Sequence, residues 1–306
     1  MQTWIVVTIA AAFFQNLRFM LQKHLKDSRL STAGTTLTRF LYGAPLACLL
    51  VAVLVAGFEY RIPVVTPEFL AFALTGGLAQ ILATHCVIAL FAERNFAVGI
   101  GFKKTETVQT AILSFLVLAE PISARGLAAI LVSLFGVLLM SKPPRLRAAD
   151  TDGLEGPMTM VVNRATGLGI AAGFLFGCSA IGYRGATLSL DGGDVLIRAS
   201  TTLAFVTVFQ ALVLSTFVRL REPGQFSAVL GSWRVAGLVG LTSVLGSLGW
   251  FVAFALQNAA YVKAVGQIEL LFTFAGSYFV FRERSRPREV AGILFVALGI
   301  LLLIAR

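Results

Sequence analysis

Two stretches of this chain decide its fold, because one repeats the other. Residues 106–120 read ETVQTAILSFLVLAE, and residues 269–283 read ELLFTFAGSYFVFRE. In both, a glutamate comes first, a threonine and a serine follow at four-residue steps, and a second glutamate closes the stretch. Shifting the chain by 163 positions aligns residues 91–140 on 254–303 without a gap, and sixteen of the fifty positions are identical. Charged and polar identities at one fixed offset indicate an internal duplication.

The composition around this repeat is typical of a membrane protein. The chain is 57% hydrophobic and 13% charged, with a mean hydropathy of +0.85, whereas soluble domains carry about 25% charged residues. A helix that spans a bilayer needs about 20 mostly apolar residues. We therefore expect an all-α integral membrane protein of ten transmembrane helices. The apolar segments cover residues 3–22, 33–57, 67–91, 96–118, 124–141, 165–187, 194–217, 235–256, 260–281 and 288–305.

The duplication divides these ten segments into two sets of five. Residues 142–164 are rich in proline, glycine and charged residues, so they form a loop between a first repeat, 1–141, and a second, 165–306. Five is an odd number, so the second repeat enters the membrane from the opposite side. Inverted repeats of this kind are typical of secondary transporters, whose substrate site lies near the middle of the membrane between the repeats.

Particular motifs extend this interpretation to a family. The chain resembles the drug/metabolite transporter superfamily in its ten-helix EamA-like form, through residues 118–123 with Gly136 and residues 282–285 with Gly299. Arg39 resembles the arginine often found early in the second helix of that family. The resemblance implies proton- or exchange-coupled movement, often export, of small metabolites. The chain departs from the family in its weakly basic loop at 58–66 and in its strongly charged fourth segment.

Ionisable side chains within the apolar segments are the candidates for function. Each costs about 2.5–3.5 kcal/mol near the centre of a membrane, so it persists where it faces a cavity or a partner. We expect a substrate-binding or coupling role for eleven residues: Glu106, Glu269, Lys103, Lys104, Arg18, Arg39, Arg198, Lys263, His85, Gln80 and Trp250.

The two duplicated glutamates are the central pair of this set. Glu106, Thr110 and Ser114 share one face of their helix, and Lys103 lies three residues before Glu106, within reach of an ion pair. The third, fourth, eighth and ninth segments, with Gln80, Thr84, His85, Ser243, Ser247 and Trp250, are expected to line one polar pocket. The alternative is that Glu106 and Glu269 only stabilise helix packing, because buried ion pairs are often structural.

The remaining candidates each have a structural alternative. Arg39 and Arg198 could bind a carboxylate or phosphate with their planar guanidinium groups, or extend to the membrane interface. His85 could be a hydrogen-bonded core histidine. Glu120 and Glu283 lie in turns, where we expect a structural role.

These features favour a secondary active transporter, of exporter type, for a small polar metabolite. Cations dominate the intramembrane candidates, which favours a substrate with a carboxylate or phosphate, such as an amino acid or organic acid; protons are a candidate for the coupling ion. No motif for a metal or cofactor is present, and the net charge of +10 lies mainly between apolar runs, which argues for lipid contact and against nucleic acid. An intramembrane enzyme and a channel are the alternatives, and the sequence leaves the oligomeric state open.

The basic loops also predict an orientation in the cell (inner) membrane. Fifteen Lys and Arg residues lie in the connections on the side opposite the termini, and three lie on the termini's own side. Loops rich in Lys and Arg stay in the cytoplasm, so both termini are expected outside. The family resemblance implies the reverse orientation.

Overall fold

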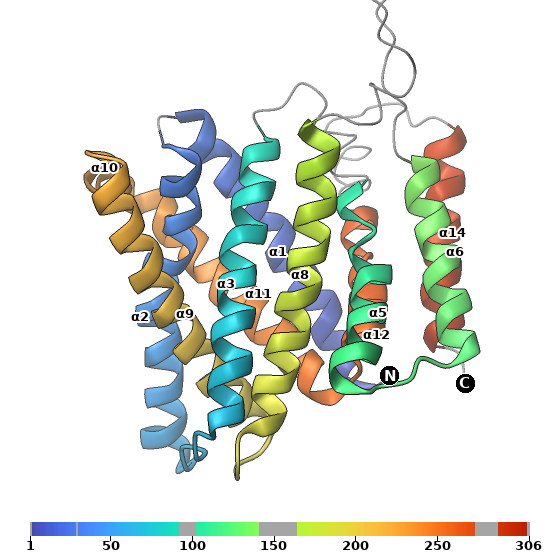
Figure 1. Ribbon diagram of the computed structural model, residues 1–306, viewed down its shortest axis with the longest axis horizontal. Helices are drawn as coiled ribbons and strands as arrows, with labels where there is room; N and C mark the ends of the chain where they lie inside the picture. Colours follow the sequence, from blue (N-terminus) through green and yellow to red (C-terminus); the bar gives the residue numbers. More distant parts are fainter. Residues whose placement is uncertain (1, 29, 92–101, 141–163, 273–286, 305–306) are drawn as a thin grey trace, which may run out of the picture.

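The computed structural model describes residues 2–28, 30–91, 102–140, 164–272 and 287–304, and these segments are helical throughout apart from turns and one isolated β-bridge (Figure 1). Six helices are long and apolar enough to cross a membrane. This confirms an all-α chain that fits an integral membrane protein. The six are α1 (Thr3–Ser28), α2 (Thr32–Phe58), α3 (Pro67–Leu90), α8 (Arg164–Ser189), α9 (Val195–Arg221) and α11 (Trp233–Leu256).

Five shorter helices have both of their ends within the described residues. They are α5 (Glu106–Leu118), α6 (Ala124–Met140), α10 (Gln225–Gly231), α12 (Ala259–Gly266) and α14 (Pro287–Ile304). The predicted segments 96–118 and 260–281 lie partly outside the described residues, as does nearly all of the predicted loop 142–164. Ten spans and an inverted repeat therefore stay predictions.

Local capping explains where several long helices begin. The hydroxyl of Ser31 accepts a hydrogen bond from the amide of Gly34, and Thr66 caps α3 in the same way with Pro67 at its first position. The carboxylate of Asp194 accepts from two amides at the start of α9. Each cap supplies an acceptor for amides that have no partner within the helix. These caps fix the short connections between successive long helices.

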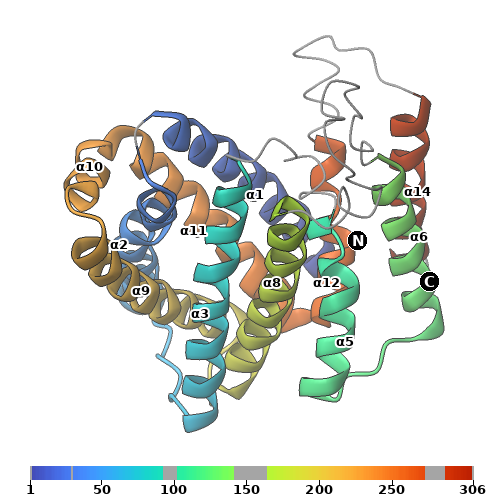
Figure 2. The ribbon, with the colours of Figure 1, turned by 45° about the horizontal axis from the view of Figure 1, so that its top comes forward.

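The helices pack as close pairs: α1 on α11, α2 on α9, α3 on α8 and α6 on α14 (Figures 1 and 2). Glycines allow the closest approaches. A Cβ added to Gly182 would lie 2.7 Å from the Cα of Gly76 in α3, and one on Gly136 would lie 2.5 Å from the carbonyl oxygen of Gly292 in α14. Gly173 allows α8 to approach the start of α5, where a Cβ would lie 3.0 Å from the carbonyl oxygen of Lys103. Small residues at such crossings let helix backbones meet.

The connections alternate between the two ends of the bundle. Both chain ends lie at the lower end in Figure 1, together with the α2–α3, α5–α6 and α8–α9 connections. The α1–α2 connection and α10 lie at the opposite end. This placement agrees with the alternation expected from the sequence for these segments.

One prediction about helix continuity is wrong. The apolar segments 96–118 and 260–281 were expected to be single helices, but both are interrupted within their described parts. A turn at Lys104 and Thr105 precedes α5, and a turn at Gln267 and Ile268 follows α12 before helix resumes at Glu269. The two turns are 163 positions apart, the offset of the sequence repeat. Apolar periodicity does not mark such a break, because an apolar run continues after each turn.

Candidate functional site

The breaks place a glutamate at the same point of each interrupted helix. Glu106 is the first residue of α5 after its turn, and Glu269 is the first residue of the helical turn that follows α12. The first amides of a helix carry a partial positive charge, which favours a carboxylate there. The duplicated glutamates of the sequence thus lie where two helices begin inside the bundle.

Each of these glutamates forms an ion pair with a lysine of the other repeat. The Nζ of Lys263 lies 2.5 Å from the Oε1 of Glu106, and Lys104 pairs with Glu269. Lys103 also contacts Glu106, at 3.6 Å, as its position three residues earlier predicted. The amide of Gln15 in α1 donates a hydrogen bond to Glu269 at 3.0 Å. In each pair the lysine and the glutamate come from different repeats. This reciprocal pairing could not be predicted from which residues share a helix face.

These five charged side chains are only 7–14% exposed. Breaking such a pair by removing one partner is expensive, because the other charge stays buried without compensation. Three lysines share two carboxylates, so the lysine–glutamate cluster (Lys103, Lys104, Glu106, Lys263, Glu269) carries a net positive charge. The arrangement can therefore accept a further anionic group.

Aromatic rings surround the ammonium group of Lys263. Its Nζ lies 4.9 Å from the ring centre of Trp250, 5.6 Å from that of Phe254 and 5.7 Å from that of Phe176. A cation over a ring face is attracted by the ring's quadrupole. Trp250 is buried and its indole N–H has no hydrogen-bond partner among the described residues. Trp250 thus belongs to this wall, and its predicted role in substrate binding stays a prediction.

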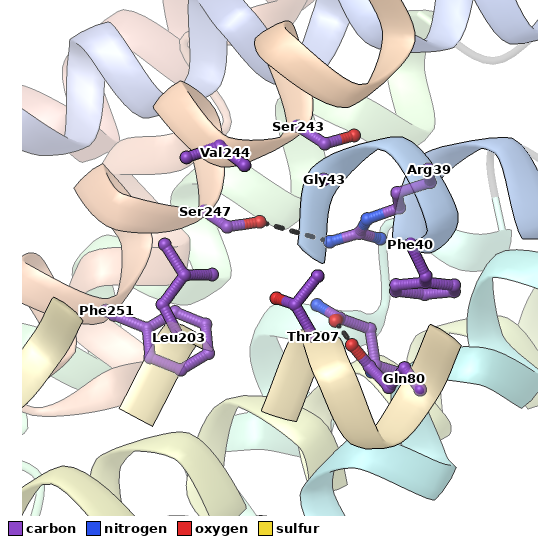
Figure 3. A pocket seen from close by; sticks show the side chains of 11 residues that line it. Arg39, Phe40, Gly43, Gln80, Leu203, Thr207, Ser243, Val244, Ser247 and Phe251 are labelled. Carbon is purple, nitrogen blue, oxygen red and sulfur yellow. Dashed lines mark hydrogen bonds between the residues drawn. The ribbon is translucent and has the colours of Figure 1, made fainter. Parts of the chain in front are cut away.

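A second polar region surrounds Arg39 in the middle of the bundle (Figure 3). Its guanidinium group donates to the hydroxyl of Thr84 in α3 at 3.0 Å and to that of Ser247 in α11 at 3.3 Å. Arg39 is 4% exposed, so its guanidinium group is enclosed by the surrounding helices. Gln80 lines the same cavity and accepts a hydrogen bond from Tyr183 at 2.7 Å.

Shared residues join the two polar regions into one track. One cavity is lined by Arg39, Gln80 and Ser247, and another by the lysine–glutamate cluster with Gln15. A third cavity contacts Arg39 at one side and Lys263 at the other. Each has room for about one water molecule. The polar track (the three cavities together) is therefore narrow within the part of the chain that the structure describes.

Arg18 in α1 lies close to the same charges. Its guanidinium carbon is 4.3 Å from the ring centre of Phe19, and the Nζ of Lys103 is 5.6 Å from that centre. Arg18 is 3% exposed, and its Nε and Nη2 have no hydrogen-bond partner among the described residues. A buried guanidinium in this state adds to the demand for an anion.

The structure separates some predicted candidates from this track. Arg198 lies in the first turn of α9 and His85 is half-buried in α3, and neither lines the three cavities. Thr110 packs against Gly177 of α8, and Ser114 binds Glu120 at 3.1 Å. Of the predicted helix face Glu106, Thr110 and Ser114, only Glu106 thus lines the track. Its counterparts Thr273 and Ser277 lie outside the described residues.

Tyr183 and Gln210 line the track and were not among the sequence candidates. Tyr183 of α8 is fully buried and stacks on Phe251 with ring centres 4.3 Å apart. Gln210 of α9, also fully buried, donates to Gln80 at 3.1 Å and to the hydroxyl of Tyr183 at 3.1 Å. A glutamine in the middle of an apolar segment is the signal that could have identified Gln210.

Glu120 lies in a separate network that joins the two repeats at the end of the bundle that carries the termini. Arg184 of α8 donates to both of its carboxylate oxygens, with Nη2 2.5 Å from Oε1. Asn258 donates to Glu120 at 3.1 Å, and Arg184 also donates to the carbonyl oxygens of Phe254 and Gln257. The network ties the α5–α6 turn to the end of α11, which agrees with the structural role expected for Glu120.

Further contacts between the repeats lie at both ends of the bundle. At the termini end, Val64 and Asp191 form the isolated β-bridge. Nearby, a hydrogen bond with Asp194 raises the pKa of Tyr60. At the opposite end, Ser31 before α2 binds Glu222 and Gln225 after α9. These contacts hold the two halves of the chain together at each end of the bundle.

Comparison with known proteins identifies the fold alone. No family model matches the chain, and no curated protein matches it. A solved structure described only as "Crystal structure of protein" superposes with a TM-score of 0.69 at 12% sequence identity, and covers 99% of this chain and 96% of its own. At that identity, the likeness extends to the arrangement of helices and not to an activity.

Proposed function

We propose that this chain is a secondary active transporter of a small polar metabolite that carries a carboxylate or phosphate. In this proposal ten helices form two inverted five-helix repeats, and rocking of one against the other exposes the polar track to each side of the membrane in turn. The sequence resemblance to the ten-helix EamA-like transporters belongs to the same proposal.

One observation carries it: two helices break at repeat-equivalent positions, and each break presents a glutamate paired with a lysine of the other repeat. Interrupted helices that meet at the repeat interface are the usual construction of transporter substrate sites. Buried ionisable residues in membrane segments typically mark substrate or ion pathways.

The helix contacts also support two repeats of the same internal order. In that order α3 of the first repeat is equivalent to α11 of the second, and α1 is equivalent to α8. The α3–α8 pair is therefore equivalent to the α11–α1 pair, and both pairs are in close contact. The α2–α9 and α6–α14 pairs each correspond to themselves. An inverted repeat requires this pattern.

Counterflow in proteoliposomes tests the function. Vesicles containing the protein are preloaded with an unlabelled solute from a panel of amino acids, organic acids and phosphate esters, and uptake of the labelled solute is followed. A carrier shows transient accumulation that needs the preload, whereas a channel only equilibrates the solute and an enzyme converts it.

The matched variants are Glu106→Gln in the track and Arg61→Gln in the exposed α2–α3 loop. We expect counterflow to be lost in the first and retained in the second. Absence of counterflow with every anionic solute in the panel, from protein that is folded by gel filtration and thermal unfolding, would refute the proposal.

A further inference from the structure

The charges along the polar track are unequally distributed, and this inequality limits what can fill it. Arg39 has only neutral partners, the hydroxyls of Thr84 and Ser247, among the described residues. At the other end, three lysines share Glu106 and Glu269, and Arg18 lies nearby. Counted over the described residues, both ends of the track therefore carry an excess of formal positive charge.

The wall between the two ends is aromatic. Tyr183, Trp250, Phe251 and Phe254 line the cavity that contacts both Arg39 and Lys263. Burial of apolar surface against such rings is favourable, while a charged group opposite them would lose its hydration without a partner. The middle of a bound molecule should therefore be apolar.

The two cations contact the same small cavity. Arg39 and Lys263 both line it, together with Ser247 and Trp250, which are three residues apart on α11. A single small molecule in this space can therefore contact both cations, and a short chain is enough to join its two acidic groups.

We infer that the transported solute is a short diacid, with one acidic group at Arg39 and the other at the lysine–glutamate cluster. This inference rests on the proposed transport function and narrows it. A molecule with one carboxylate neutralises one end of the track and leaves a buried cation at the other. A phosphate ester carries its two charges at one end, so it has the charge of a diacid without the spacing.

Thermal-shift titration of the purified full-length chain tests the inference with succinate, glutarate and adipate. A ligand of the folded state raises the unfolding temperature, and at a fixed ligand concentration the shift grows with the logarithm of the affinity. The matched comparison is the monomethyl ester of each acid, which keeps the length and loses one charge. We expect the diacid that fits best to bind at least about tenfold more tightly than its own monomethyl ester. The ester cannot form the second charge-assisted hydrogen bond.

The variant Arg39→Gln locates the second charge. It should weaken diacid binding about tenfold or more and change ester binding less than about twofold, so that the two ligands become equivalent. Arg61→Gln in the exposed loop should change neither. If Arg39→Gln fails to fold, Arg39→Lys keeps the charge and should retain the preference for diacids, and the diacid–ester comparison on the unmodified chain stands by itself.

Three outcomes would overturn the inference: equal binding of diacid and ester, binding of none of the diacids, or tighter binding of glycerol 3-phosphate with no dependence on Arg39. Failure of the proposed function is a different result. Counterflow of a monocarboxylate or amino acid would keep the transporter and reject the diacid, whereas no counterflow of any anionic solute would reject the transporter.

Discussion

Replacing Glu106 by glutamine removes one of the two carboxylates that three buried lysines share. Lys263, at 2.5 Å, and Lys103, at 3.6 Å, then lose their nearest counter-charge. Removal of one partner from a buried ion pair costs about 3–5 kcal/mol, because the remaining charge stays away from water. At about 2 °C per kcal/mol for a chain of this size, the unfolding temperature should fall by at least about 6 °C.

The reverse change, Lys263→Met, should cost less. Glu106 keeps Lys103 as a partner, and methionine fills a similar volume among the aromatic rings. The double variant removes both charges and leaves neither unpaired through this contact, so it should be less destabilised than the sum of the two single variants by about 1–3 kcal/mol.

The assay is thermal unfolding of the four proteins in one detergent, with Arg61→Gln as the surface control. Two results would refute the reasoning. One is a larger loss for Lys263→Met than for Glu106→Gln. The other is strict additivity in the double variant, which would mean that the two side chains do not interact in the folded protein.

Three further predictions concern other parts of the fold. Glu120→Gln should lower the free energy of unfolding by about 3 kcal/mol, because Arg184 loses its carboxylate partner. The protein that remains folded should still bind ligand. Loss of binding in folded protein would mean that Glu120 belongs to the site. Gly182→Ala should destabilise by about 1–3 kcal/mol in thermal unfolding, because its Cβ meets the backbone of α3, whereas Gly237→Ala, whose Cβ meets nothing within 4 Å, should not; equal effects would contradict this packing. A cysteine at Thr151, outside the described residues, should resist a membrane-impermeant thiol reagent in intact cells once the native cysteines are removed, since the basic loops are predicted to be cytoplasmic; ready labelling would reverse the orientation.

The membrane character of the chain was predictable because it depends on composition and on local sequence. Runs of about 20 apolar residues are helical in a membrane for a backbone reason: only a helix satisfies every peptide hydrogen bond within the run. This is why the expected segments 33–57, 67–91 and 235–256 agree with α2, α3 and α11 to within two residues at each end.

The site was only partly predictable from the same information. Ionisable residues in apolar runs identified Arg18, Arg39, Lys104, Glu106 and Lys263 without any structure, because each must have a partner or a cavity. The contact of Lys103 with Glu106 was also predictable, because it joins residues three apart on one helical turn. Periodicity then failed for Thr110 and Ser114, whose side chains meet α8 and Glu120 in place of the track.

The sequence by itself determined the helical, membrane-type chain, its internal duplication and the set of buried charges. Only the tertiary structure decided which charges meet. Glu106 pairs with a lysine 157 positions away and Glu269 with one 165 positions away, and such distances along the chain leave no trace in local periodicity. The close approach of α8 to the start of α5 at Gly173 likewise joins segments far apart in the sequence. Which pairs form is set by how the helices of the two halves pack together, and no single segment of the chain contains that information.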